Sequence, residues 1–218
     1  MTENPKSKAW LENAYDLATP DDNRAYYEGF AEAYDAEFAD ALGYCYPQII
    51  AQSYIREAGF GDAPVADIGC GTGLVAEGLP PGLSIDGFDI SPQMLEKAGR
   101  KQLYKALHEI DITGELGPHK GRYGAVLSAG TFTHGHLGPE PLENLIGIGR
   151  KGALFVIGVN KAHFEAQGFG DVLERLVDAD QISDFEMSET RIYDRKGHDH
   201  SDDLAFVLVF RRSVKRKS

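Results

Sequence analysis

The chain has 218 residues, of which 42% are hydrophobic, and this is enough to bury one sizeable core. Acidic residues outnumber basic ones by 34 to 22, and the net charge of −12 argues against a nucleic-acid partner, because an acidic surface repels phosphate. No apolar run has membrane-spanning length and residues 1–8 are polar, so we expect neither a membrane partner nor secretion. Two cysteines, Cys45 and Cys70, make no disulfide framework, and we expect a reduced protein in the cytoplasm.

The first 60 residues are predicted to form a helical cap that packs on a core made by residues 61–218. Aromatic residues recur at helical spacing between residues 22 and 38, and they predict a helix that packs on the core or closes over a ligand. A second helix is expected to begin at Pro47 and to end at Gly59. Its inner face should carry Ile49, Ile50, Tyr54 and Ile55.

The stretch from residue 65 to residue 73 (VADIGCGTG) combines a short apolar strand with a glycine-rich turn. Its three glycines, Gly69, Gly71 and Gly73, stand at alternate positions, where their freedom of backbone angle lets a ligand lie against the main chain. A helix-compatible run begins at Leu74, so the N–H groups of a helix N-terminus should face that ligand. Strand, turn and helix together predict the ligand-binding corner of a doubly wound α/β domain.

The rest of the chain alternates short apolar runs with segments that suit helices. Four of these runs predict further strands, at residues 84–90, 105–110, 124–128 and 152–159. Helices are expected after Ser91 and over residues 169–178, so we predict an α/β fold with a mostly parallel sheet and helices on both faces. Residues 182–193 and 204–210 predict two antiparallel strands joined by a polar loop.

An aspartate closes each of three successive predicted strands: Asp67, Asp89 and Asp111. The ends of parallel strands meet at one edge of a sheet, so these carboxylates should line a common crevice. Asp89, 20 residues after Gly69, suits the two hydroxyls of a ribose, and Asp111 suits an exocyclic amine such as that of adenine. Asp67 suits an ammonium group or hydrogen bonds to N–H groups of the turn. The apolar neighbours that could sandwich a base, or simply pack in the core, are Ile90, Met94 and Ile112.

The glycine pattern by itself leaves two kinds of cofactor open. Residues 71–76 also fit the dinucleotide fingerprint G-x-G-x-x-A, with Asp89 as its ribose acid, which would indicate a nicotinamide-dependent oxidoreductase. Asp67, Asp111 and the closing hairpin favour instead a smaller nucleoside whose attached group carries an ammonium and a carboxylate.

Four blocks of the sequence resemble the class I S-adenosylmethionine-dependent methyltransferases of the type 11 group, most of all the subgroup around the Williams–Beuren-region methyltransferase-like protein. These blocks are residues 27–35, 65–73, 86–98 and 123–137. The resemblance implies S-adenosyl-L-methionine as cofactor and S-adenosyl-L-homocysteine as product. It also implies a seven-stranded sheet of order 3-2-1-4-5-7-6 whose seventh strand is antiparallel. Gly124 and residues 150–152 depart from the pattern of many relatives, but only in loop detail.

The resemblance also implies which residues of this chain hold the cofactor. The glycines approach its ribose and methionine part, Ser128 and Ala129 face the methionine ammonium through their carbonyls, and two tyrosines reach it from the N-terminal helices. The main-chain N–H of Ile112 can reach a ring nitrogen of the adenine. The complete implied set is Tyr27, Tyr34, Asp67, Gly69, Gly71, Gly73, Asp89, Ile90, Met94, Asp111, Ile112, Ser128 and Ala129.

The chemistry then follows from an activated sulfonium methyl group. Catalysis can rest largely on holding acceptor, methyl and sulfur in line, and a base is needed only where the acceptor must lose a proton. His134, His136 and His163 are candidate bases, and we favour His134 because it lies nearest the expected methyl position. We expect an O, N or S atom of a small molecule as acceptor, with a non-catalytic cofactor-binding protein as an alternative. The loop 198–203 has metal-ligand composition but is expected to be solvated, and no metal site is predicted.

Overall fold

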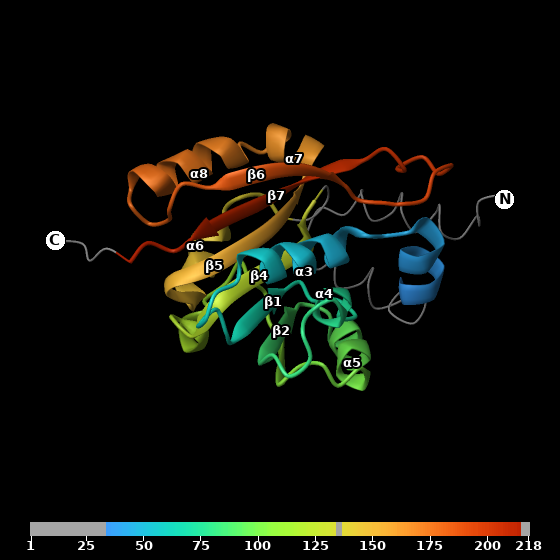
Figure 1. Ribbon diagram of the computed structural model, residues 1–218, viewed down its shortest axis with the longest axis horizontal. Helices are drawn as coiled ribbons and strands as arrows, with labels where there is room; N and C mark the ends of the chain where they lie inside the picture. The colour runs from blue at the N-terminus through green and yellow to red at the C-terminus, as the bar shows by residue number, and fades with distance from the viewer. Residues whose placement is uncertain (1–33, 134–136, 215–218) are drawn as a thin grey trace.

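The computed structural model describes residues 34–133 and 137–214, without the side chains of residues 36–38. Its strands are β1 (Val65–Ile68), β2 (Ile85–Asp89), β3 (Ala106–Glu109), β4 (Tyr123–Phe132), β5 (Gly149–Asn160), β6 (Glu186–Arg191) and β7 (Leu204–Arg211). They form one seven-stranded sheet in the order β3-β2-β1-β4-β5-β7-β6 (Figure 1). β1 to β5 pair in parallel, while β7 runs antiparallel to both β5 and β6. The predicted fold class, strand order and closing hairpin are therefore confirmed.

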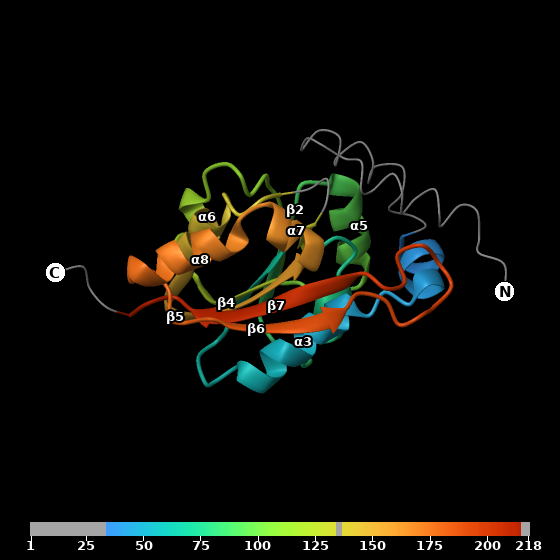
Figure 2. The ribbon, with the colours of Figure 1, turned by 90° about the horizontal axis from the view of Figure 1, so that it is seen from above.

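Helices cover both faces of this sheet. They are α3 (Tyr46–Glu57), α4 (Leu74–Glu77), α5 (Pro92–Arg100), α6 (Leu142–Ile148), α7 (Lys161–Ala166) and α8 (Phe169–Asp178), with a π-helix η1 (Tyr34–Asp40) and a 3-10 turn η2 (Gly117–His119). α3 lies on one side of the sheet, and α6 and α8 lie on the other (Figure 2). The central parallel strands are buried on both faces, which explains the continuous apolar run of residues 153–159 in β5.

Several element boundaries differ from those predicted. β4 and β5 extend beyond the runs 124–128 and 152–159, because Tyr123 pairs with Gly149 at one end and Phe132 pairs with Val159 at the other, across irregular register. α3 ends at Glu57, since Ala58 is already extended and Asp62 accepts a hydrogen bond from the Gly59 N–H. Ile55, expected on the inner face of α3, is 49% exposed, and that part of the prediction was wrong.

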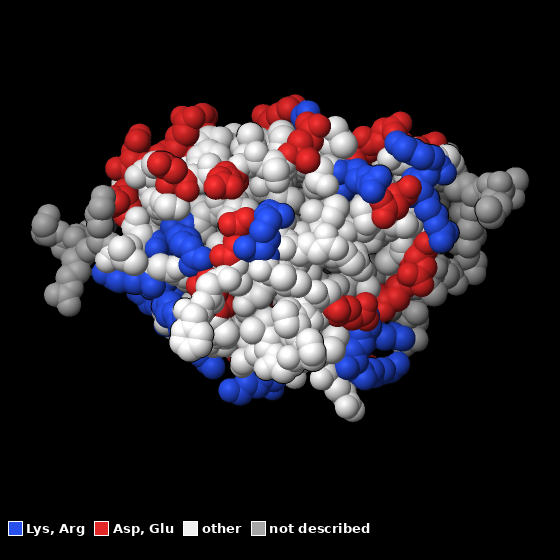
Figure 3. All heavy atoms as spheres, viewed as in Figure 1, with Lys and Arg blue, Asp and Glu red and all other residues white. Residues whose placement is uncertain are grey.

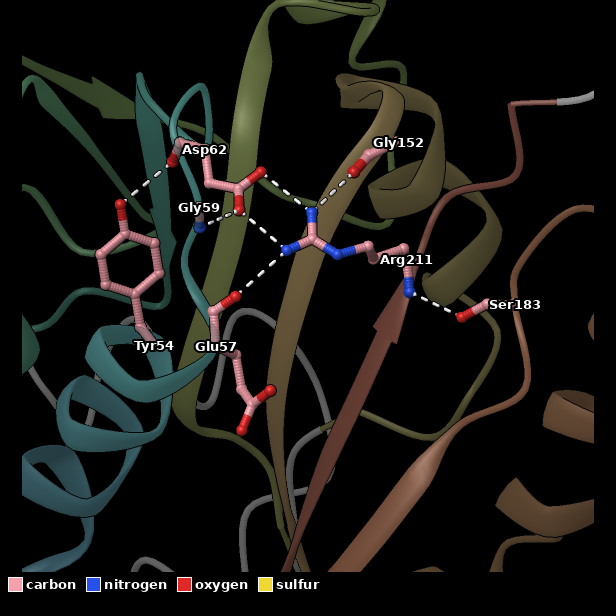
Figure 4. Close-up of polar contacts among 7 residues, drawn as sticks. All are labelled: Tyr54, Glu57, Gly59, Asp62, Gly152, Ser183 and Arg211. Carbon is pink, nitrogen blue, oxygen red and sulfur yellow. Dashed lines mark hydrogen bonds and ion pairs between the residues drawn. The ribbon is translucent and has the colours of Figure 1, made fainter.

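A partly buried ion pair ties the loop after α3 to the end of β7 (Figure 4). Both terminal nitrogens of the Arg211 guanidinium donate to the Asp62 carboxylate, at 3.0 and 2.8 Å, and they also donate to the carbonyls of Glu57 and Gly152. Burial tends to raise the pKa of Asp62, but the bonds from Arg211 and from the Gly59 N–H more than offset it and lower that pKa. We call this arrangement the clasp.

We expect Arg211→Ala to destabilise the protein by about 2 kcal/mol, which lies below the usual cost of breaking a buried pair because Arg211 is partly exposed. This would lower the melting temperature by about 4–8 °C in calorimetry at pH 7. Since the pKa of Asp62 is lowered, the loss should shrink as the pH falls below its ordinary value of 3.8. Arg175→Ala, which removes the exposed pair with Glu143, is the control and should change little. Equal effects of the two substitutions would contradict the role of the clasp.

The predicted division into a cap of residues 1–60 and a core of residues 61–218 remains a prediction, because residues 1–33 lie outside the described part of the chain. Where the chain is described, α3 packs on the sheet through Ile50, Ala51 and Tyr54. None of the described helices has the length and apolar character needed to cross a membrane.

Candidate active site

A pocket opens at the carboxyl ends of β1, β2, β3 and β4, where the doubly wound topology places a ligand. The glycine turn, the segments after β2 and β3, the end of β4 and the N-terminal segment contribute to its wall. The lining residues are Tyr34, Tyr44, Pro47, Gly69, Cys70, Gly71, Thr72, Leu74, Val75, Phe88, Asp89, Ile90, Met94, Ile110, Asp111, Ile112, Ala129, Gly130, Thr131 and Leu137.

Most of the predicted cofactor residues converge on this pocket. Those that line it are Tyr34, Gly69, Gly71, Asp89, Ile90, Met94, Asp111, Ile112 and Ala129. Gly73, Asp67 and Ser128 lie outside its lining, and they pack behind it instead. Tyr27, His134 and His136 lie outside the described residues, so their predicted roles stay predictions.

The three glycines of the turn serve different purposes. Gly71 has a left-handed backbone (φ +53°), and a Cβ there would meet nothing within 4 Å, so its main chain borders open space. A Cβ on Gly69 would collide with the Thr131 hydroxyl, and one on Gly73 would lie 3.1 Å from the Tyr104 ring. Gly71 is therefore the glycine that leaves room for a ligand, whereas Gly69 and Gly73 allow close packing against Thr131 and Tyr104.

Asp89 connects the turn to the start of α5. Its Oδ2 accepts a hydrogen bond from the Gly71 N–H at 2.8 Å, and its Oδ1 accepts one from the Ser91 N–H at 2.9 Å. Burial raises the pKa of this carboxyl, and the two N–H donors partly offset the effect. Each carboxylate oxygen keeps a second lone pair, so Asp89 can still accept hydrogen bonds from a ligand.

Asp111 and its apolar neighbours form the other end of the pocket. The Thr113 N–H and hydroxyl both donate to Oδ1 of Asp111, at 2.9 and 2.7 Å, which fixes this carboxylate at the rim. Met94 is almost fully buried and also lines the pocket, so it belongs both to the core and to the wall. Ile90 and Ile112 complete an apolar slot between the two carboxylates.

Asp67 lies completely buried behind the turn. The Tyr104 hydroxyl donates to its Oδ2 at 2.7 Å, and Oδ1 has no hydrogen-bond partner among the described residues. Burial raises the pKa of Asp67 to about 7, the Tyr104 hydrogen bond pulls it down, and nearby Asp89 adds to the rise. Of the two roles predicted for Asp67, hydrogen bonds to N–H groups of the turn are not found in the described structure.

Two site residues had no signal in the sequence. Tyr104 precedes β3 and reaches Asp67, which lies 37 residues away along the chain. Thr131 lines the pocket, accepts a hydrogen bond from the Ser128 hydroxyl at 2.8 Å and donates to the Ile68 carbonyl at 3.0 Å. This chain of hydroxyls fixes the end of β4 against the end of β1.

His163 has a structural environment rather than a catalytic one. Its side chain is buried, and its ring Nε2 lies 2.9 Å from the Leu137 carbonyl. Its main-chain N–H donates to the Asn160 side chain that caps α7. In the polar loop of the hairpin, His200 pairs with Asp203. The described residues contain no group of three or more His, Cys, Asp or Glu side chains that could hold a metal ion.

Comparison with known proteins adds an independent line of evidence. The family described as "Methyltransferase domain" has a model that matches residues 65–147, the stretch from β1 through α6 that builds most of the pocket. Residues 65–147 therefore carry a methyltransferase domain, and the sheet has the strand order of the class I S-adenosylmethionine-dependent methyltransferases. S-adenosylmethionine is therefore its cofactor, and the nicotinamide alternative is not retained. The type 11 subgroup stays a prediction.

Several solved structures share the fold at low sequence identity. A putative S-adenosyl-L-methionine-dependent methyltransferase from Methanococcus maripaludis is 16% identical, with a TM-score of 0.59 over 89% of this chain and 95% of that one. A TehB-like SAM-dependent methyltransferase from Corynebacterium glutamicum is 20% identical, with a TM-score of 0.58 over 87% and 99%. The [4+2]-cyclase SpnF is 16% identical, with a TM-score of 0.65 over 91% and 98%. No curated protein sequence matches the chain.

The pocket of this methyltransferase fits the cofactor in three respects. Its lining combines two carboxylates with apolar side chains, which suits the ribose and the amine of an adenosine. It also has bare main chain at Gly71, where any side chain would fill part of the space. The buried, unpartnered Oδ1 of Asp67 behind the turn adds negative potential that suits a cation.

Proposed function

We propose that this methyltransferase transfers a methyl group from S-adenosylmethionine to an O, N or S atom of a small molecule, in the reducing environment of the cytoplasm. The proposal of a small acceptor rests on the side chains that line the pocket beside the end of β4. There Tyr34, Tyr44, Pro47 and Leu137 give the pocket aromatic and apolar sides, a lining that suits a small organic molecule. The two thiols, Cys45 and Cys70, are free, in keeping with a reducing compartment.

The charge of the surface supports this choice over a polynucleotide acceptor. Asp and Glu side chains gather over α7, α8 and β6, at the top of the face in Figure 3. They include the exposed residues Asp171, Glu174, Asp178, Asp184, Glu186 and Glu189. Together with the net charge of −12, this surface would repel a phosphate backbone.

We assign the cofactor contacts by the chemistry of the lining. Asp89 would accept hydrogen bonds from the ribose hydroxyls, and Asp111 would accept one from the adenine amine. Ile90, Met94 and Ile112 would flank the base. The bare main chain of Gly71 and the end of β4 would border the methionine part. Tyr27 and Ser128 keep their predicted roles as part of this proposal.

The residues around the reacting atoms have mainly a positioning role. The bound cofactor supplies an activated methyl group, so the protein gains rate by holding the acceptor in line with it. Burial, together with the neighbouring Cys45, raises the pKa of Tyr44, which keeps this phenol protonated at neutral pH. Tyr44 can therefore donate a hydrogen bond but cannot act as a base. His134 remains our proposed base for acceptors that must lose a proton.

Calorimetry followed by a turnover assay tests the proposal. We expect S-adenosylmethionine and S-adenosylhomocysteine to bind the purified protein, and NADH and NADPH to produce no heat. Labelled methyl groups should then appear on members of a panel of small phenols, amines and thiols, and not on RNA or protein. Transfer to RNA or protein alone would overturn the small-molecule acceptor. Cofactor binding without transfer to any acceptor would support the non-catalytic alternative.

A further inference from the structure

The carboxylate of Asp35 joins the N-terminal segment to the glycine turn and to α5. The Thr72 hydroxyl donates to its Oδ1 at 2.5 Å, and the Lys101 ammonium lies 2.7 Å from its Oδ2. Lys101, at the C-cap of α5, also lies 2.7 Å from Oε1 of Glu77 in α4. We call these four side chains the latch, since they connect parts of the chain that are distant in sequence.

The latch differs from an ordinary surface ion pair. The Thr72 side chain is buried, and the Lys101 side chain is only 21% exposed although it carries a charge. Burial tends to lower the pKa of Lys101, yet its bonds to Asp35 and Glu77 more than offset this and raise it. Because one oxygen of Asp35 meets a fixed hydroxyl and the other meets the ammonium, the carboxylate is held at two points.

The latch connects two segments that line the cofactor pocket. Tyr34, next to Asp35 in the chain, belongs to one, and Thr72 with its neighbour Gly71 belongs to the other. Gly71 is also the residue whose N–H is held by Asp89. A change at Asp35 therefore reaches both Tyr34 and the turn without altering any group that lines the pocket.

The C-terminal end of the segment that begins at Tyr34 is attached to the loop between β6 and β7. Arg195 donates to the Ala41 carbonyl at 3.1 Å, and the Asp194 N–H donates to the Gly43 carbonyl at 2.8 Å. Gly43 has a left-handed backbone (φ +67°) packed against Arg195. The segment from Tyr34 to Gly43 is thus fixed to the hairpin loop at one end and to the pocket by Asp35 at the other.

We propose that Asp35 is a positioning residue for the cofactor: through Thr72 and Lys101 it holds Tyr34 against the pocket and thereby sets how long the cofactor stays bound. If Tyr34 is already held in its bound position, cofactor binding does not have to pay the conformational entropy of ordering it. The inference depends on the cofactor and not on the identity of the acceptor.

The test measures the affinity of S-adenosylhomocysteine by calorimetry and its dissociation rate by displacement. Asp35→Ala should weaken binding about tenfold, a typical loss for one charge-assisted hydrogen bond, through faster dissociation with little change in association. Thr72→Val removes the other partner at nearly constant volume and should have a similar effect. The double variant should be no worse than Asp35→Ala, since that substitution already breaks the bond between Asp35 and Thr72.

Glu77→Ala is the matched control. Glu77 pairs with the same lysine and is about as exposed as Asp35, but it contacts neither Thr72 nor the segment of Tyr34. It should leave the affinity within about twofold, a change of roughly 0.4 kcal/mol. Hydrogen exchange with ligand bound should rise over residues 34–43 in the Asp35 variant, while residues 85–98 stay protected.

Two results would overturn the inference. One is an affinity of Asp35→Ala and Thr72→Val within twofold of the wild type, and the other is equal weakening by Glu77→Ala. Should Asp35→Ala fail to fold, Asp35→Asn replaces it, since the amide oxygen still accepts from Thr72 while the ion pair with Lys101 is lost. A wild-type protein that binds no S-adenosylhomocysteine would instead contradict the assignment of the pocket.

Discussion

Asp89→Ala is expected to weaken binding of S-adenosylhomocysteine at least about a hundredfold, because two charge-assisted hydrogen bonds within the protein are lost along with the proposed ribose contact. The carboxylate holds the Gly71 N–H on one side and the Ser91 N–H on the other. Without it the turn loses its attachment to the start of α5, and the pocket loses a charged side chain. Isothermal calorimetry on folded variants measures the effect.

Asp111→Ala is the control for this expectation. It removes a carboxylate from the same pocket, but among the described residues the side-chain bonds of this carboxylate go to Thr113 in the adjacent loop. We expect a loss of about tenfold, in line with a single charge-assisted hydrogen bond. If Asp89→Ala bound the ligand within tenfold of the wild type, the proposed placement of the ribose would be untenable.

Asp67→Asn is expected to stabilise the ligand-free protein, and more so at high pH. The pKa of Asp67 is about 7 in the fold against an ordinary value of 3.8. The folded state thus favours the neutral carboxyl, so the contribution of Asp67 to stability is fully present below pH 3.8 and is lost as the pH rises through 7. Asparagine is neutral at every pH, and its amide oxygen can still accept the Tyr104 hydrogen bond.

Urea unfolding at two pH values checks the sign of this pH dependence of stability. The shift corresponds to roughly 4 kcal/mol at full ionisation, at about 1.4 kcal/mol per pKa unit, so the gain from Asp67→Asn should be about 3 kcal/mol larger at pH 8.5 than at pH 5. Tyr104→Phe, which leaves the carboxyl without its donor, should destabilise the protein instead. A gain that did not depend on pH would show that Asp67 is not titrating in the fold.

Asp67→Asn should also have a cost for function. A buried carboxylate behind the turn attracts the positive charges of S-adenosylmethionine, and its neutral replacement cannot. We therefore expect weaker binding of S-adenosylmethionine by the more stable variant. Improved binding would contradict an electrostatic role for Asp67.

The sequence by itself determined the α/β fold, the glycine turn, the aspartate that ends β2 and the aspartate in the loop after β3. These features are local: a strand shows as a run of apolar residues, a turn shows as glycines, and a helix such as α8 shows as a periodic face between residues 169 and 178. The strand order followed from the resemblance to a family rather than from the pattern. The sequence also placed Asp89 and Asp111 at one edge, because parallel strands end together.

Only the tertiary structure decided which polar side chains meet. Tyr104 and Asp67 are 37 residues apart, as are Asp35 and Thr72, and Arg211 lies 149 residues from Asp62. Thr131 likewise reaches a carbonyl 63 residues earlier. Such pairs have no period in the sequence, since each depends on the register of strands and on the path of loops. Their hydrogen bonds form only after the apolar faces have packed, and for that reason the latch, the clasp and the environment of Asp67 could not be predicted.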